Sequence, residues 1–151
     1  MKEYTTNSPE ETFELAKQLA EKAVPGSIIT LSGSLGVGKT VFAKGYAAGL
    51  GIKTSVSSPT FTIMNVYDEG RIPLYHFDVY RVETEEEMYN VGYEEYFYGN
   101  GVCLIEWPEK IKSLLPESYL KIHISRALDK DYDYRKITVE KEGYGIDLSD
   151  R

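Results

Sequence analysis

The stretch that decides the fold is residues 27–40, which read SIITLSGSLGVGKT. It begins as a short, β-branched strand and continues into a glycine-rich segment, residues 33–40, that fits G-x-x-x-x-G-K-[S/T] at every fixed position. A helix is expected to follow to about Leu50, because Gly49 and Gly51 mark its end. A strand, a glycine loop and a helix in this order predict an α/β domain with a phosphate-binding loop.

The chemistry of such a loop comes from its backbone and from the two residues that close it. Glycines adopt positive φ angles and let backbone N–H groups turn toward phosphate oxygens, while the positive end of the next helix faces the same anion. Lys39 is expected to reach the β- and γ-phosphates, and the Thr40 hydroxyl to ligate magnesium. The sequence therefore predicts a nucleotide site made of Gly33, Ser34, Leu35, Gly36, Val37, Gly38, Lys39, Thr40 and Val41.

Segments on both sides of this unit carry their own boundary signals. A helix is expected from Pro9, with Ser8 as its cap and Glu11 completing a capping box. The β-branched and aromatic runs on either side of residues 68–71 predict an antiparallel hairpin. Further along, the sequence predicts helices at 84–89 and 108–115 and strands at 102–106, 119–125 and 135–140.

The organisation expected from these elements is one α/β domain over residues 1–151. The chain has no repeat, no long linker and no break in composition. The hairpin makes the central sheet mixed, with helices flanking it, so the prediction is a phosphate-loop NTPase domain with a mixed sheet. The tail, about residues 143–151, is expected to be loosely held.

Two carboxylates are candidates to hold magnesium, directly or through water. Glu106 ends the apolar run VCLIE before Trp107 and Pro108 break the strand, and Asp78 lies in the strand-like segment YHFDVYR. An acid at the end of a buried strand beside a phosphate loop favours a functional role, so Glu106 is assigned to the metal. Asp78 is assigned to orienting the attacking water or supporting the metal site, with an ion pair to Arg81 as the structural alternative.

Four further side chains have both a functional and a structural interpretation. Thr60, in SSPTF, could sense the γ-phosphate or could cap a local turn. His76 and His123 lie in apolar strands and are interpreted as structural, because nothing supplies partners for a zinc site. Trp107 could pack against the nucleotide site, although a core position is the simpler interpretation.

Composition narrows the possible partners and the compartment. A formal net charge of -7 over 151 residues, with scattered basic residues, disfavours direct binding to a nucleic-acid backbone. No apolar stretch approaches the roughly 20 residues that span a bilayer, and the N-terminus has no signal-like region. The single cysteine, Cys103, lies in an apolar run and fits a small core residue in a reduced, cytoplasmic setting.

The phosphate loop alone leaves the class of nucleotide-binding protein open. A GTPase would normally carry an Asn-Lys-x-Asp element that reads guanine, and the sequence has none. A small-molecule kinase usually neutralises the moving phosphoryl group with an arginine-rich lid, whereas the arginines here do not cluster. An ATPase remains by elimination.

The motifs taken together resemble a known family. GSLGVGKT, SPTFTIMNVY, YHFDVYRV, GYEEY and IEWPE occur in the order and spacing of the bacterial ATPase subunit of the tRNA threonylcarbamoyladenosine-modifying system, over residues 8–139. The resemblance implies magnesium-dependent ATP hydrolysis that supports turnover of the threonylcarbamoyl-transferase, which modifies the adenosine next to the anticodon in ANN-decoding tRNAs. It implies partnership with the transferase subunit and its inactive-homologue companion, and contact with tRNA only through that complex.

The resemblance also implies roles for individual residues. It assigns the phosphate and metal positions to Lys39 and Thr40, and places Thr12 and Arg135 near segments that border the nucleotide. The remaining motif positions, in SPT, HFD and IEW, fall on Thr60, Asp78, Glu106 and Trp107.

The chain departs from the family pattern at three positions in and just after the loop. Ser34 stands where an acid or amide is usual, Val37 replaces alanine, and Val41 replaces a second threonine. ATP is still expected to bind, because Lys39 and Thr40 remain, but affinity, basal hydrolysis or the partner contact could differ. A stand-alone small-molecule kinase and a nucleotide sensor with negligible turnover are the alternatives to the accessory ATPase.

Overall fold

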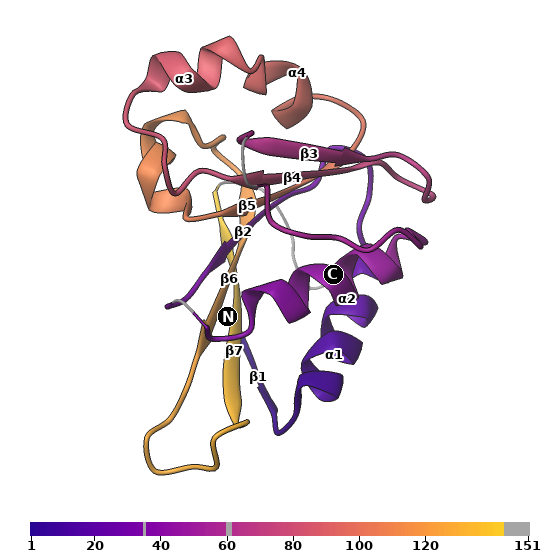
Figure 1. The fold of residues 1–151 in the computed structure, drawn as a ribbon, viewed down its shortest axis with the longest axis vertical. Helices are drawn as coiled ribbons and strands as arrows, with labels where there is room; N and C mark the ends of the chain where they lie inside the picture. The colour runs from indigo at the N-terminus through magenta and orange to yellow at the C-terminus, as the bar shows by residue number, and fades with distance from the viewer. Residues whose placement is uncertain (35, 60–61, 144–151) are drawn as a thin grey trace.

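The central feature of the fold is a mixed seven-stranded sheet (Figure 1). A computed structural model describes residues 1–34, 36–59 and 62–143. The strands are β1 (Lys2–Thr6), β2 (Ile28–Ser32), β3 (Met64–Tyr67), β4 (Leu74–Asp78), β5 (Val102–Glu106), β6 (Tyr119–Ser125) and β7 (Arg135–Glu142). They lie in the order β1-β7-β6-β2-β5-β4-β3.

The middle of the sheet is parallel and its edges are antiparallel. Strands β6, β2, β5 and β4 pair in parallel, whereas β3 pairs with β4, β7 with β6, and β1 with β7 in antiparallel fashion. The predicted hairpin and mixed sheet are thus confirmed. Parallel neighbours end at the same edge, so β4 and β5 bring Asp78 opposite Glu106 at their carboxyl ends.

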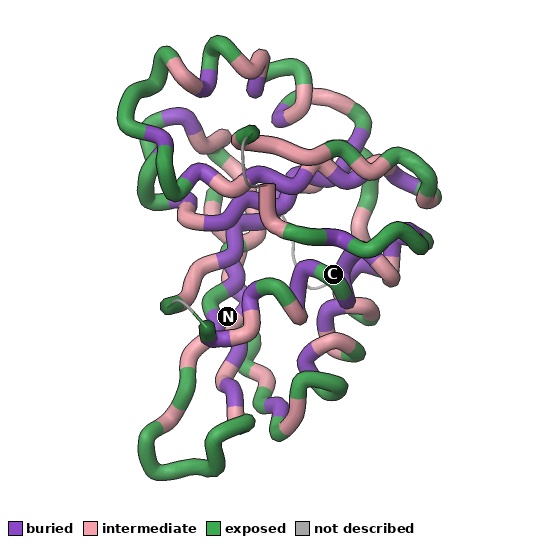
Figure 2. Tube along the Cα trace, in the orientation of Figure 1, coloured by how far each residue is buried: buried purple, intermediate pink, exposed green. Residues whose placement is uncertain are grey.

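Helices cover both faces of the sheet (Figure 1). Two longer helices pack together on one face of the sheet. The three short helices lie on the other face, where their buried residues form a second hydrophobic core. The helices are α1 (Pro9–Glu21), α2 (Lys39–Gly49), α3 (Glu85–Asn90), α4 (Tyr93–Phe97) and the 3-10 helix η1 (Pro108–Leu114). Figure 2 shows that the buried positions concentrate in the strands between these layers.

The two cores follow from the alternation of side chains along the central strands. Ile29 and Leu31 of β2 belong to the core beneath α1 and α2, whereas Ile28 belongs to the core beneath α3, α4 and η1. Every residue of β5 is buried, as expected for a central parallel strand that is covered on both faces.

Helices α1 and α2 pack with their backbones in close contact. A Cβ atom at Gly45 would collide with the carbonyl oxygen of Phe13, and one at Gly49 with the carbonyl oxygen of Lys17. The C-terminal end of α1 is tied to the β3–β4 turn by Arg71, which donates to the carbonyl oxygens of Ala20, Glu21 and Ala23 at 2.8–3.1 Å. The helix that begins at the glycine loop is therefore held against the sheet by its neighbour.

The structure corrects several details of the sequence prediction. Strand β1 and helix α4 were not predicted, and the expected helix at 108–115 is a 3-10 helix with non-helical angles at Ile111. Ser8 caps α1 as expected, but the Glu11 carboxylate accepts from the N–H of Asn7 rather than completing a capping box on Ser8. The predicted loosely held tail lies outside the described residues from 144 onward.

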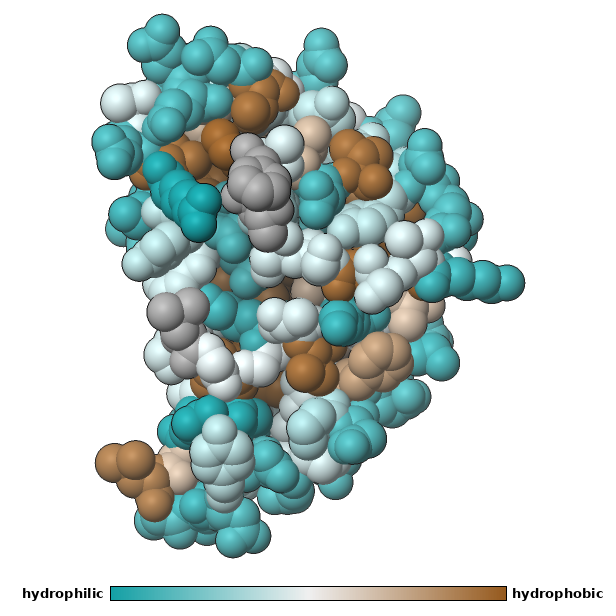
Figure 3. Space-filling view, viewed as in Figure 1, coloured by the Kyte–Doolittle hydropathy of each residue, from teal (hydrophilic) through white to brown (hydrophobic). Residues whose placement is uncertain are grey.

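The viewed face of the molecule is largely hydrophilic, with apolar side chains in separate small groups (Figure 3). Among the residues that the structure describes, no helix combines the length and the apolar character needed to cross a membrane.

Candidate functional site: a phosphate loop with two carboxylates

The glycine loop leads from the end of β2 to the start of α2. Gly33, Gly36 and Gly38 have φ angles of 152°, 76° and 110°, conformations that side chains with a Cβ rarely adopt. Gly33 also lies so close to the carbonyl oxygen of Ile124 that a Cβ atom there would be 2.7 Å from it. These conformations explain the two glycines that the pattern fixes, Gly33 and Gly38, and also the glycine at the variable position 36.

Two arginines hold the carbonyl groups of the loop from outside. Arg135, at the start of β7, donates its Nε–H to the carbonyl oxygen of Val37 at 2.6 Å. Arg126 donates from Nη2 to the carbonyl oxygen of Gly36 at 3.0 Å. With carbonyls fixed outward in this way, loop N–H groups are available for an anion. Arg135 was predicted to border the nucleotide, whereas Arg126 was missed because its contact is 90 residues away in sequence.

Lys39, the first residue of α2, is a buried cation without a hydrogen-bond acceptor. The residue is 6% exposed, and its Nζ has no hydrogen-bond partner among the described residues. The ammonium group lies 3.7 Å from the ring centroid of Trp107. Burial lowers the pKa of Lys39 below its ordinary value of 10.5, although the carboxylates of Glu106, Asp78 and Glu109 act in the opposite direction. A buried cation in this state favours an incoming anion.

Trp107 lies between the site and one of the two cores. It is the one described non-glycine residue with a positive φ, 62°, and it is only partly buried. One aromatic neighbour is Tyr80, with ring centroids 4.8 Å apart. The left-handed backbone directs the chain away just after β5 and leaves the indole beside Lys39. Trp107 therefore packs against the core beneath the short helices, as the simpler interpretation had it, and also borders the site.

The two predicted carboxylates lie at the tips of neighbouring strands but in different surroundings. Glu106 is 3% exposed, and its Oε2 lies 2.6 Å from Nε2 of His76. Asp78 is partly buried, and its Oδ1 accepts from the backbone N–H of Tyr80 at 3.0 Å. Side chains alternate between the two faces of a strand, so His76 and Asp78 of β4 lie on the same face of the sheet. Glu106 lies on that face too, because it is the register partner of Asp78.

These groups surround one cavity of about 300 Å³ at the carboxyl ends of the parallel strands. The structure thus brings together the predicted site residues Lys39, Thr40, Asp78 and Glu106, and it adds Ser58 and Trp107. Leu35 and Thr60 lie outside the described residues. The lining residues are Gly36, Gly38, Lys39, Thr40, Ser58, Asp78, Glu106 and Trp107.

A second cavity, of about 230 Å³, adjoins the other side of the loop. Gly36 and Gly38 line both cavities, so the loop separates them. Thr12 lines the second one, with its hydroxyl 2.7 Å from that of Thr6. The lining residues are Pro9, Thr12, Gly36, Val37, Gly38, Val41, Tyr132, Asp133 and Arg135. Ser34 is exposed, and it lines neither cavity.

No group of three or more His, Cys, Asp or Glu side chains within the described part of the chain could hold a metal ion. His123 is exposed, with Nδ1 2.8 Å from the Ser32 hydroxyl. Cys103 is fully buried, and burial raises the pKa of its thiol to about 12, which makes it a core residue rather than a nucleophile.

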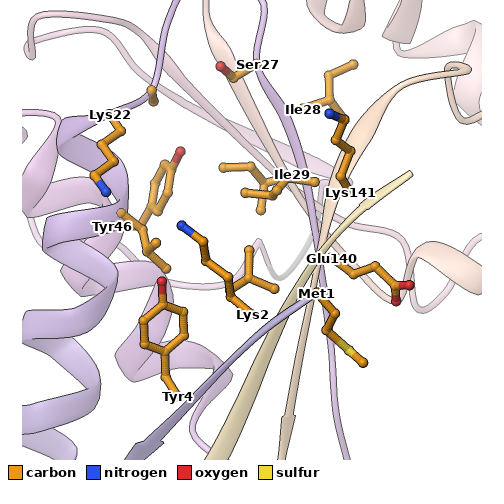
Figure 4. A pocket seen from close by; sticks show the side chains of 14 residues that line it. Met1, Lys2, Tyr4, Lys22, Ser27, Ile28, Ile29, Tyr46, Glu140 and Lys141 are labelled. Atoms are coloured by element: carbon orange, nitrogen blue, oxygen red, sulfur yellow. The ribbon is translucent and has the colours of Figure 1, made fainter. Parts of the chain in front are cut away.

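A larger cavity lies at the opposite end of the sheet, between the strands and the helix pair (Figure 4). It has a volume of about 440 Å³ and contains none of the predicted site residues. Lys2, Lys22 and Tyr46 point into it, over an apolar floor that includes Ile29 (Figure 4).

The fold and the site together define a mixed α/β domain of the phosphate-loop class, with the loop between β2 and α2 and acids at the tips of β4 and β5. Residues 6–137 match the family model described as "Threonylcarbamoyl adenosine biosynthesis protein TsaE". The chain therefore belongs to the TsaE family.

Individual relatives agree with this assignment. A tRNA threonylcarbamoyladenosine biosynthesis protein TsaE from Bacillus subtilis is 51% identical over 140 residues, which cover 93% of this chain and 85% of the relative. The one from Rickettsia prowazekii is 37% identical over 146 residues, which cover 96% of this chain and 99% of the relative. The crystal structure of YdiB from Bacillus subtilis superposes with a TM-score of 0.76 at 44% identity, covering 93% of this chain and 84% of that one.

Proposed function

We propose that the cavity beside Lys39 binds the phosphates of ATP. The observation that carries this proposal is the buried Lys39 ammonium group, which has no acceptor among the described residues and faces a glycine loop whose carbonyls are held by arginines. A phosphate chain supplies the missing acceptors and compensates the burial of the charge. The adjoining cavity, with Thr12 and Arg135, is on the side of the loop where the nucleoside would lie.

Magnesium fits the same cavity as a partner of the nucleotide. Thr40 and Glu106 are the residues that would hold it, which is fewer protein ligands than a preformed site requires. Mg²⁺ is commonly held by one or two carboxylates together with substrate phosphates, and it neutralises charge on the transferring phosphoryl group. The buried position of Glu106 at the end of β5, facing this cavity, supports assigning the metal role to this residue.

Hydrolysis needs a group that orients water near the terminal phosphate. Asp78 lines the cavity, is partly exposed, and accepts from the backbone N–H of Tyr80, whereas the buried His76 contacts Glu106. These properties suit a residue that orients the attacking water. Thr60 remains a candidate γ-phosphate sensor on sequence grounds alone.

The biological role follows from the family. The relatives are named tRNA threonylcarbamoyladenosine biosynthesis proteins, so this chain has a role in that biosynthesis. Within it, we assign the chain to the accessory ATPase that supports turnover of the threonylcarbamoyl-transferase subunit and its inactive-homologue companion. The net charge of -7 favours docking to a more basic partner that itself holds the tRNA.

One assay separates this function from a kinase and from a sensor. Labelled ATP is incubated with the chain alone, with the transferase pair, and with candidate small-molecule acceptors, and the products and tRNA modification are measured. Released phosphate that increases with the transferase pair supports the proposal. Label on a small acceptor would indicate a kinase, and slow turnover that no partner stimulates would indicate a sensor. Tight tRNA binding by the isolated chain at physiological salt would contradict indirect recruitment.

A further inference from the structure

His76 is a buried side chain that the proposed chemistry leaves unexplained. It lies in the middle of β4 and is 1% exposed. Its Nε2 is 2.6 Å from Oε2 of Glu106, and its Nδ1 has no hydrogen-bond partner among the described residues. The imidazole therefore makes one short, buried hydrogen bond, and the residue at the other end is the assigned metal carboxylate.

The environment of the two ring nitrogens determines where the proton lies. A neutral imidazole carries one N–H, and the other nitrogen is an acceptor. A proton on Nδ1 would be a buried donor with nothing to accept it, whereas a proton on Nε2 is donated to the carboxylate. Nε2 accordingly carries the proton of this hydrogen bond and donates it to Oε2 of Glu106.

We propose that His76 is a positioning residue for the metal: by donating Nε2–H to Oε2, it fixes the Glu106 carboxylate so that Oε1 is presented to the cavity. This inference rests on the metal role of Glu106 in the proposed function. A glutamate carboxylate rotates broadly about its last torsion, and one hydrogen bond to Oε2 removes that freedom. Hydrogen bonds of this kind to metal ligands typically contribute a factor of about 10–100 in metal affinity or activity.

The backbone supports the same geometry from both strands. Leu104 is the register partner of His76, and Glu106 is two residues further along β5. The histidine thus reaches diagonally along one face of the sheet to the tip of the neighbouring strand. Asp78, the direct neighbour of Glu106, accepts from Tyr80 instead, so the structure shows this histidine contact for only one of the two acids.

Magnesium dependence of nucleotide binding tests the proposal in the full chain. ATP affinity is measured by calorimetry across a Mg²⁺ series for the wild type, His76→Leu and His76→Gln, and with EDTA. Glutamine can place an amide N–H near the position of Nε2, and leucine cannot. We expect His76→Leu to require about 10–100-fold more Mg²⁺, with ATP affinity in EDTA unchanged, and His76→Gln to recover most of the loss.

Two outcomes would overturn the inference, and they have different meanings. If the wild type binds ATP equally with and without Mg²⁺, the metal role of Glu106 fails and the inference fails with it. If the wild type requires Mg²⁺ but His76→Leu has the same requirement, or glutamine rescues nothing, only the inference is overturned.

Nitrogen NMR of the histidine ring gives a second test that needs neither nucleotide nor a core variant. The chain has two histidines, so His123→Gln leaves His76 as the only signal. His123 is exposed and lines neither cavity beside the loop, which makes it a suitable change. We expect Nε2 to be protonated. A ring with its only proton on Nδ1 would overturn the proposed arrangement.

Discussion

The two ends of the central sheet carry cavities of opposite character. The one at the amino ends of the parallel strands is larger, about 440 Å³, and is built on apolar side chains with lysines around it. The one at the carboxyl ends is smaller, about 300 Å³, and holds Lys39, Asp78 and Glu106. In parallel α/β sheets ligands bind outside the carboxyl ends of the strands, so the smaller cavity has the functional position.

The difference indicates that a buried charged group without a hydrogen-bond partner is a better guide to a binding site than cavity volume is. Lys22, beside the larger cavity, is exposed and can be hydrated by solvent. Lys39 is buried, has a lowered pKa and lacks an acceptor among the described residues. Burying an ammonium group without an acceptor costs free energy in the folded protein. Binding of an anion to that group would compensate the cost, which explains why the protein keeps the lysine there.

The largest expected effect comes from changing one lysine at each end. Lys39→Ala removes the charge-assisted contacts to the phosphates, so ATP affinity should fall about 100-fold or more. Lys22→Ala should leave it unchanged. Calorimetry with Mg²⁺ and ATP measures both, and thermal unfolding confirms that each variant is folded. Equal losses, or a greater loss in Lys22→Ala, would reverse the assignment of the two cavities.

The two acids at the functional end are expected to differ in kind. Glu106→Ala removes the carboxylate that we propose holds the metal and leaves His76 without its partner, so Mg²⁺-dependent ATP binding should weaken and hydrolysis should fall about 100-fold or more. Asp78→Ala should slow hydrolysis by about the same order while ATP binding stays close to wild type. Initial rates and binding isotherms are measured on both variants. Mild and equal effects would contradict this division of roles.

The sequence predicted the local parts of this account. The strand, glycine loop and helix around Lys39 are contiguous, and Glu106 ends an apolar run, so pattern alone located both. Strand β1 was missed because its residues KEYTT are mostly exposed and its pairing is with β7, with Lys2 opposite Val139. Such a partner lies outside any local window of sequence.

Contacts between side chains on different strands could likewise not be predicted from the sequence. The contact of His76 with Glu106 depends on the β4–β5 register, and that of Arg126 with the carbonyl of Gly36 depends on the place of β6 beside β2. One signal for His76 was available, because it is two residues before Asp78 and therefore on the same face of a strand. Without the register, nothing indicated which carboxylate it would meet.

A smaller effect is expected from pH and again separates the two lysines. Because burial lowers the pKa of Lys39, the unliganded ammonium group loses its proton at a lower pH than an ordinary lysine. ATP affinity should therefore decline as pH rises toward 10.5, and it should decline before an exposed lysine would titrate. Binding isotherms over alkaline pH measure this on the wild type and on Lys22→Ala, which should behave identically. A constant affinity up to 10.5 would contradict the burial argument.

The smallest effect is expected from the apolar wall of the larger cavity. Val139 is 8% exposed and lines that cavity, so Val139→Ala should lower the free energy of unfolding by about 1 kcal/mol. ATP affinity and hydrolysis should not change. Denaturant unfolding and the ATP assay measure the two properties, and a loss of ATP binding without a loss of stability would give the larger cavity a functional role.

The central claim is that nucleotide binds at the carboxyl ends of the parallel strands, beside the buried Lys39 ammonium group. A crystal structure of the chain with a non-hydrolysable ATP analogue and Mg²⁺ tests it most directly. The account predicts phosphates against residues 36–40, with Lys39 withdrawn from Trp107 to the β- and γ-phosphates and Mg²⁺ beside Thr40 and Glu106. Nucleotide in the cavity beside Lys22 and Tyr46, or a loop left empty at saturating nucleotide, would contradict it.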